Sequence, residues 1–296
     1  MKQIFIAVLL TLSALQAFTQ AKQFNHGTEK RRYIIYIPDA YHKDQTKSFP
    51  VVFNFHGGGM TMTEHMFYTG MNRSAEKNGY IVVYPQGIKQ DWNVGFDMSY
   101  QFGSNDVDYV NTLLEFLLKQ YRIDPTRVYA TGLSRGGFFC QRLAAELPEK
   151  FAAIASVGGT LPDSVAYFHQ KKIAMPVMVI HGTADVIVTY NGKDKAYKSA
   201  NATYQYWKKH NGLETIKESV KSIDKNKTDS TSLHILQSSG NNISVQLVSI
   251  KGGGHTWPGS DPFNIGFSLG KTSSEIDAND LIWKFFSAHI RKERVH

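Results

Sequence analysis

The sequence predicts an α/β fold in which a mainly parallel central sheet carries helices on both faces. Apolar runs of strand length alternate with helical patterns through most of the chain, an order typical of strands joined by crossover helices. The hydrophobic fraction of 42% over 296 residues is also sufficient for a substantial core. No linker-like stretch divides the chain, so we expect one domain over residues 22–296.

The first 21 residues have the layout of a cleavable secretory signal peptide. Lys2 precedes an apolar run over residues 4–15, and small residues follow around Ala17 and Ala21. This run is too short for an ordinary transmembrane helix, and no later stretch approaches the roughly 20 apolar residues that a span needs. We therefore expect a secreted or periplasmic protein without stable membrane insertion.

Charge and cysteine content narrow the class further. The formal net charge is +8, but Lys and Arg are scattered and no basic run interleaves with aromatic residues, which argues against a nucleic-acid partner. Cys140 is the only cysteine, so no intramolecular disulfide can form. Its place on the apolar side of a predicted helix favours a core residue over a reactive thiol. No His or Cys spacing suits a metal, and no cofactor is expected.

Strand and helix signals follow one another along the first half of the chain. Asn105 or Asp106 can cap a helix whose apolar residues recur at helical spacing between positions 110 and 118. The expected elements here are strands at residues 32–37, 51–55, 81–84 and 128–131, and a helix from residue 105 or 106.

The second half continues the alternation, beginning with a helix over residues 135–146 that Pro148 ends. The remaining expected elements are strands at residues 152–157, 177–181 and 245–250, and helices at residues 203–210 and 275–289. The polar stretch over residues 214–242 is expected to form extended or hairpin structure outside the main sheet.

A candidate nucleophile lies between the strand at 128–131 and the helix at 135–146. The segment GLSRG, residues 132–136, fits the G-x-S-x-G nucleophile elbow, whose glycines leave room for a tight, strained turn. Such a turn lifts the Ser134 hydroxyl clear of the sheet, and the helix that follows favours an oxyanion at its amino terminus. A purely structural turn can carry the same letters, but the strand before and the helix after favour an α/β-hydrolase fold with Ser134 as nucleophile.

A serine hydroxyl needs a base beside it and an acid that orients the base. This fold expects the chain order Ser, then Asp or Glu, then His. Asp185 follows the strand that ends at His181, where an Asx turn or helix cap is the alternative role. His255 follows an apolar strand through KGGGH, and His56 and His181 are competitors that end strands as core or loop-bracing groups. Chain order favours Asp185 as acid and His255 as base.

The run FHGGG, residues 55–59, follows an early buried strand and resembles the loop that supplies one oxyanion-hole N–H in this fold. We expect the donors to be the backbone of Gly57 or Gly58 and of Arg135, although the sequence does not choose among the three glycines. A glycine-rich turn between strand and helix is the structural alternative.

Three further side chains lie near these motifs and are candidates for contact with substrate. They are His56, Trp92 and Trp257. The two indoles can form walls of an acyl- or sugar-binding cleft, and buried packing is the equal alternative.

Four segments together resemble a known family. They are FHGGG, DPTRVYATGLSRGG, HGTADVIVTYNG and GGGHTWPG, in this order along the chain. This set is similar to the extracellular polyhydroxybutyrate depolymerase-type esterases, a family that includes feruloyl and acetylxylan esterases. The resemblance implies Ser134, Asp185 and His255 as the triad and hydrolysis of an acyl ester. Many members have Asn or Ala where this chain has Arg135, and many are disulfide-bonded.

We therefore expect a secreted serine ester hydrolase acting on feruloyl, acetyl or hydroxyalkanoate esters, either small or attached to a polymer such as xylan. No obligatory protein partner is inferred. A serine peptidase of the same fold is one alternative, because the three residues do not distinguish ester from amide. A non-catalytic carbohydrate-binding protein that kept the fold is the other.

Overall fold

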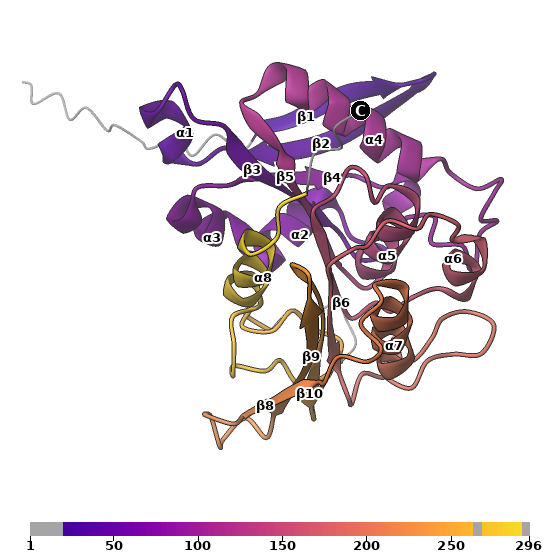
Figure 1. The fold of residues 1–296 in the computed structure, drawn as a ribbon. Helices are drawn as coiled ribbons and strands as arrows, with labels where there is room; N and C mark the ends of the chain where they lie inside the picture. The colour runs from indigo at the N-terminus through magenta and orange to yellow at the C-terminus, as the bar shows by residue number, and fades with distance from the viewer. Residues whose placement is uncertain (1–19, 263–267, 292–296) are drawn as a thin grey trace, which may run out of the picture.

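The structure is a computed structural model that describes residues 20–262 and 268–291. The predicted signal peptide lies outside these residues except for its last two positions. The described chain builds one sheet of ten strands (Figure 1). The strands are β1 (Gln20–His26), β2 (Glu29–Tyr36), β3 (Phe49–Phe55), β4 (Ile81–Pro85), β5 (Ile123–Leu133), β6 (Ala153–Val157), β7 (Val177–Gly182), β8 (Ser219–Ile223), β9 (Ser232–Gly240) and β10 (Ile243–Lys251).

The spatial order of the strands is β1-β2-β4-β3-β5-β6-β7-β10-β9-β8. The six central strands from β4 to β10 pair in parallel, and the strands at both edges pair antiparallel. The predicted mainly parallel sheet is confirmed. Because the central strands are parallel, their carboxyl ends lie at one edge of the sheet, which we call the catalytic edge.

Helices cover both faces of the sheet. They are α1 (Asp39–Lys43), α2 (Met62–Thr69), α3 (Met71–Asn78), the short 3-10 helix η1 (Ile88–Gln90), α4 (Asp106–Gln120), α5 (Arg135–Glu146), α6 (Asp163–Phe168), α7 (Ala200–His210) and α8 (Ala278–Ser287). Figure 1 shows α4, α5, α6 and α7 on one side of the sheet and α2, α3 and α8 on the other. Among the described helices, none has the length and apolar character needed to cross a membrane.

Two hydrophobic clusters fill the spaces between the sheet and its two helix layers. Successive residues of a strand point to opposite faces, and β3 illustrates this: Val51 and Phe53 belong to one cluster and Val52 to the other. Because the central strands are covered on both faces, their sequences are nearly continuous apolar runs. Cys140 lies fully buried in α5, and burial raises the pKa of its thiol well above the usual value.

Helix boundaries follow capping residues. The helix expected at residues 275–289 begins at Ala278, because the Asp277 side chain accepts hydrogen bonds from the backbone amides of Asn279 and Asp280. The predicted helix at 135–146 coincides with α5.

The prediction for residues 214–242 is half right. The segment contains the hairpin-like strands β8 and β9, but they belong to the main sheet, because β9 pairs antiparallel with β10 along its whole length. The polar sequence offers no sign that these strands join the main sheet. The reason is that β8 forms the outer edge of the sheet, where all but one of its residues are exposed and need not be apolar.

Candidate active site

Ser134 occupies a strained turn between β5 and α5. Its backbone has φ 56° and ψ −118°, a conformation that non-glycine residues rarely adopt and that functional turns retain. Its amide donates to the Val157 carbonyl at 2.8 Å, and its own carbonyl accepts from Phe138 to start α5. A Cβ at Gly136 would lie 2.1 Å from the Phe55 carbonyl oxygen, so this position of the elbow excludes any side chain.

Asp185 and His255 form a close pair at the catalytic edge. Asp185 Oδ2 lies 2.6 Å from His255 Nδ1, and both residues are only 5% exposed. Asp185 Oδ1 accepts hydrogen bonds from the amides of Ile187 at 2.9 Å and Val188 at 2.8 Å. A carboxylate partner assigns the imidazole proton to Nδ1, which leaves the Nε2 lone pair of His255 to act as a base.

The imidazole of His255 stands over the end of β6, next to the elbow. A Cβ at Gly158 would lie 3.1 Å from both Nδ1 and Cε1 of His255. The residue before it, Val157, accepts the hydrogen bond from the Ser134 amide. The structure thus brings Ser134, Asp185 and His255 from three strand ends to one part of the catalytic edge.

A second histidine, His181, supports the carboxylate. Its Nε2 lies 3.4 Å from Asp185 Oδ2 and 2.7 Å from the Val188 carbonyl oxygen, and its ring is buried at the end of β7. Burial alone would raise the pKa of Asp185, but the hydrogen bonds from His181 and His255 outweigh it and lower this pKa below the usual value. Asp185 therefore stays ionised at neutral pH. The sequence indicated a core or bracing role for His181, and the geometry gives it the second.

The glycine loop after β3 packs against the elbow. A Cβ at Gly57 would lie 3.6 Å from Ser134 Cβ, and a Cβ at Gly58 would lie 2.9 Å from Arg135 Cγ. The Gly59 amide donates to the Gln90 carbonyl at 2.8 Å. Within residues 20–262 and 268–291, the amides of Gly57, Gly58 and Arg135 have no such acceptor. These amides are therefore available to an anionic oxygen beside Ser134.

His56 holds the glycine loop from behind. Its Nδ1 lies 2.8 Å from the Gly57 carbonyl oxygen, and its Nε2 accepts the Gly87 amide at 2.9 Å. Burial lowers the pKa of His56 to about 4, so the ring is neutral at pH 7 and can donate at one nitrogen while accepting at the other. Trp92 lies against this ring and donates from Nε1 to the His56 carbonyl at 3.0 Å.

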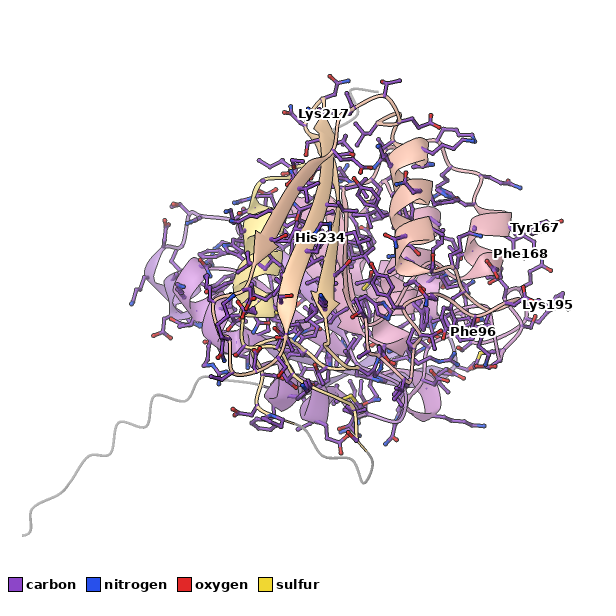
Figure 2. All side chains as sticks on the ribbon, turned by 90° about the horizontal axis from the view of Figure 1, so that it is seen from below. Phe96, Tyr167, Phe168, Lys195, Lys217 and His234 are labelled. Atoms are coloured by element: carbon purple, nitrogen blue, oxygen red, sulfur yellow. The ribbon has the colours of Figure 1, made fainter. Side chains whose placement is uncertain are left out.

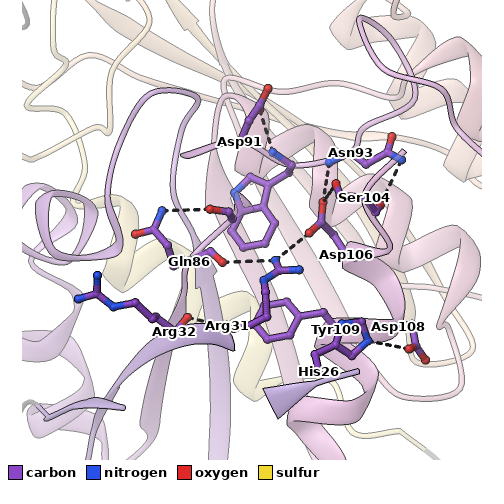
Figure 3. A network of polar contacts seen from close by, with 12 residues as sticks. His26, Arg31, Arg32, Gln86, Asp91, Asn93, Ser104, Asp106, Asp108 and Tyr109 are labelled. Atoms are coloured by element: carbon purple, nitrogen blue, oxygen red, sulfur yellow. Dashed lines mark hydrogen bonds and ion pairs between the residues drawn. The ribbon is translucent and has the colours of Figure 1, made fainter. Parts of the chain in front are cut away.

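The segment that carries Trp92 is tied down by a buried ion pair. Arg31 donates to Asp106 Oδ1 at 2.8 Å, and Asp106 Oδ2 accepts from the Asn93 amide and from the Ser104 hydroxyl (Figure 3). Arg31 also stacks on Tyr109, 3.8 Å from the ring centroid. Sequence analysis missed this network, because no local pattern pairs an arginine on β2 with an aspartate on α4.

The structure overturns the prediction that three side chains near the motifs line the substrate cleft. His56, Trp92 and Trp257 are all 0% exposed. Trp257 instead anchors the loop after His255, since its Nε1 donates to Asn279 at 3.2 Å. All three brace loops of the site from within the core, which was the packing alternative for the two indoles.

The Arg135 side chain pairs with an aspartate of the segment after β4. Its guanidinium makes two parallel hydrogen bonds to Asp91, at 2.7 and 2.8 Å. Burial opposes ionisation of Asp91, but the Arg135 guanidinium outweighs it and lowers the pKa of that carboxyl. Arg135 therefore fixes the segment after β4 beside the elbow. Among the described residues, no three His, Cys, Asp or Glu side chains gather as a metal site would require.

Comparison with known proteins places this chain among esterases. A family profile described as "Putative esterase" matches residues 25–255. The chain is 28% identical over 227 residues to "Putative esterase NocK" of Nocardia uniformis subsp. tsuyamanensis, covering 71% of this chain and 66% of that protein. It is 26% identical over 241 residues to "Feruloyl esterase B" of Piromyces equi, covering 76% of this chain and 42% of that protein.

A solved structure gives the same picture of the fold. The acetyl xylan esterase from Aspergillus awamori superposes with a TM-score of 0.61 at 17% identity, covering 91% of this chain and 99% of that one. The likeness shows that the chain has the α/β-hydrolase fold predicted from its sequence. The chain spans just under two thirds of the NocK protein and less than half of the Piromyces enzyme.

Proposed function

The chain belongs to this esterase family, and from that premise we propose that it hydrolyses carboxylic esters through a covalent acyl-enzyme on Ser134. His255 takes the proton of the Ser134 hydroxyl as the oxygen attacks the ester carbonyl, and then delivers it to the departing alcohol. A water molecule, deprotonated by the same imidazole, releases the acid and restores the serine. Asp185 orients the ring and stabilises its protonated form.

The observation that carries this proposal is the 2.6 Å contact between Asp185 Oδ2 and His255 Nδ1 beside a serine held at φ 56°. The free amides of the glycine loop and of Arg135 supply the complementary feature, donors for the oxyanion of the tetrahedral intermediate. Both features serve acyl transfer and have no role in a protein that only binds carbohydrate.

Acetyl or feruloyl esters on plant polysaccharide are the substrates we propose. Support comes from the relatives, which are named as feruloyl esterases and as acetylxylan esterases. A panel of methyl ferulate, acetylated xylan and hydroxybutyrate oligomers tests this choice. The highest kcat/KM is expected for one of the first two, and a preference for the hydroxybutyrate oligomers would contradict the proposed substrate class.

Substitution of the nucleophile tests the mechanism. Ser134→Ala should lower kcat on p-nitrophenyl acetate by about 10⁴-fold or more, and a fluorophosphonate probe should label the parent protein but not this variant. Ser239→Ala, which changes an exposed serine on β9, is the matched control and should keep full activity and labelling. Retained turnover in Ser134→Ala would refute the proposal, and equal kcat/KM on peptide anilides would favour a peptidase.

We also propose that residues 1–21 direct export and are then removed. The support is the sequence pattern of one basic residue, an apolar run and small residues. Expression in a bacterial host with mass spectrometry of the exported protein tests it. A mature protein that begins near residue 22 is expected, and an intact amino terminus in the exported fraction would contradict it.

A further inference from the structure

Exposed aromatic side chains gather on one flank of the molecule. Tyr167, on α6, is 82% exposed, and its neighbour Phe168 is 37% exposed. Figure 2 shows both side chains on the same flank as Phe96 and Lys195. Exposing aromatic rings to water is unfavourable in free energy. A cluster of exposed rings on a protein surface therefore indicates a binding site for a ligand or a partner.

The exposed rings rest on residues that are fixed by contacts of their own. Phe168 stacks nearly parallel on Tyr100, with centroids 4.7 Å apart and ring planes 17° apart, and Tyr167 meets Phe168 edge-on at 4.9 Å. Below Tyr100, the guanidinium of Arg142 lies 4.0 Å from the ring centroid, and the Tyr100 hydroxyl donates to Glu146 at 2.6 Å. We call Tyr100, Tyr167 and Phe168 the aromatic shelf. The stacked rings of Tyr100 and Phe168 are held in place before any ligand arrives, and Tyr167 extends them into solvent.

One chain segment links the aromatic shelf to the candidate active site. The segment that carries Tyr100 begins at Asp91, which pairs with Arg135 directly after the nucleophile, and passes through Phe96, whose ring centroid lies 4.9 Å from the same guanidinium. Helix α6 lies on this segment, since a Cβ at Gly95 would lie 2.1 Å from Ser164 Oγ. A long ligand on the aromatic shelf would therefore lie on the same segment that fixes the elbow.

We propose that the aromatic shelf binds sugar rings of the polysaccharide that carries the ester, away from the bond that is cleaved. This inference rests on the proposed function, because it assigns a second contact to the same substrate. One face of a pyranose ring presents C–H groups to the electron-rich face of an aromatic ring, while its rim of hydroxyls stays in water.

The surroundings of the aromatic shelf favour a sugar over a protein surface. Polar and charged residues flank the helix that carries two of its rings: Asp163, which starts α6, pairs with Lys198 at 3.0 Å, and Gln170 lies exposed just after the end of α6. A stable protein interface needs about 800 Å² from each partner with an apolar centre. A narrow aromatic strip with polar neighbours matches a sugar ring, which combines one apolar face with a polar rim.

Binding measured without hydrolysis tests this inference separately from the proposed chemistry. In a Ser134→Ala background, affinity electrophoresis in gels containing xylan without acyl groups gives a dissociation constant. Adding Tyr167→Ala should weaken binding by about fivefold to tenfold, and Tyr167→Trp should preserve it. Val220→Ala, which trims a side chain that is 59% exposed on β8, is the matched control and should bind as the background does.

Activity measurements complete the test. With Ser134 restored, Tyr167→Ala should keep kcat/KM on p-nitrophenyl acetate within twofold and raise KM on acetylated xylan about fivefold without a change in kcat. Unchanged affinity for xylan in Tyr167→Ala, or no affinity of the parent chain for xylan, would overturn the inference. So would a loss of self-association in Tyr167→Ala by sedimentation, because the ligand would then be a second copy of the chain.

Discussion

In the proposed mechanism, the acid–base side of the site uses the side chains of Asp185 and His255, whereas the oxyanion side offers only the backbone amides of Gly57 and Gly58. The Asp185 carboxylate is charged and accepts hydrogen bonds from two amides and from the imidazoles of His255 and His181. The amides of the glycine loop are held indirectly, by the neutral ring of His56 behind it. The acid–base side depends on a carboxylate that is almost fully buried. The oxyanion side depends on the His56 ring, which supports the glycine loop from the core and does not contact the substrate.

This difference teaches where each side is vulnerable. Removing the charge at Asp185 removes the group that stabilises the protonated imidazole during the proposed reaction. Removing the His56 ring instead lets the glycine loop move from a position that its other contacts still favour. A substitution on the acid–base side should therefore lower the catalytic rate while the fold stays intact. A substitution behind the oxyanion side should lower the stability of the protein and reduce the rate by a smaller factor.

The largest effect is expected for Asp185→Asn. The amide keeps the size of the side chain and one acceptor for the loop amides, but it cannot stabilise an imidazolium and favours the wrong tautomer of His255. We expect kcat to fall by about 10³–10⁴-fold, with a melting temperature close to that of the parent. Asp194→Asn, an exposed aspartate in the same loop, should leave kcat unchanged. A loss below tenfold in Asp185→Asn would remove the carboxylate from the mechanism.

The next effect is expected for His56→Leu. Leucine leaves the Gly57 carbonyl and the Gly87 amide without partners in the core, which should cost about 2–4 kcal/mol of folding free energy. The loop should also shift, lowering kcat about 10–100-fold as an oxyanion donor moves. Urea unfolding and steady-state kinetics measure both, and His234→Leu on the exposed face of β9 is the matched control. Full stability with a loss of rate as large as in Asp185→Asn would abolish the contrast between the two sides.

The pH dependence of stability tests the role of His56 on the oxyanion side. The unfolded chain protonates His56 near its ordinary pKa of 6.5, but in the folded chain burial lowers this pKa to about 4. Between these values the unfolded state binds more protons, so stability that is present above pH 6.5 is lost as the pH falls toward 4. The loss from this group should reach about 2–3 kcal/mol at pH 4.5. His56→Gln should therefore show a shallower fall than the parent in urea unfolding between pH 7 and 4.5, and parallel curves would contradict this.

The smallest effect is expected for Arg135→Met. In the proposed mechanism only the backbone amide of this residue serves the oxyanion, and the side chain acts through a partly exposed pair with Asp91. We expect a loss of about 1 kcal/mol in stability and of two- to fivefold in kcat. Asp91→Asn should give a similar loss, and the double variant should cost little more than either. A 100-fold loss of kcat in Arg135→Met would mean that the guanidinium itself contacts the substrate.

Local patterns were sufficient to predict the parts of the molecule that depend on neighbours in the chain. The helix at 135–146 was predictable because its apolar residues repeat at helical spacing and Pro148 follows it. The elbow was predictable because glycines flank Ser134 in a fixed pattern between strand and helix.

Contacts between distant segments were beyond the sequence. His56 meets Gly87 only because β3 and β4 lie side by side in parallel register, and the pairing of Arg31 with Asp106 joins positions 75 residues apart. The burial of Trp92 and Trp257 depends on such neighbours as well, so an indole near a motif could not be assigned to a cleft or to the core in advance.

Cys140 gives the chain a native reporter of its own unfolding. The thiol lies fully buried under α5, close in sequence to Ser134, and is the only one in the chain. A maleimide dye can reach it only in molecules in which α5 has separated from the sheet. The labelling rate in dilute denaturant therefore reports how often the structure around Ser134 opens, with no engineered probe and no second thiol to confuse the signal.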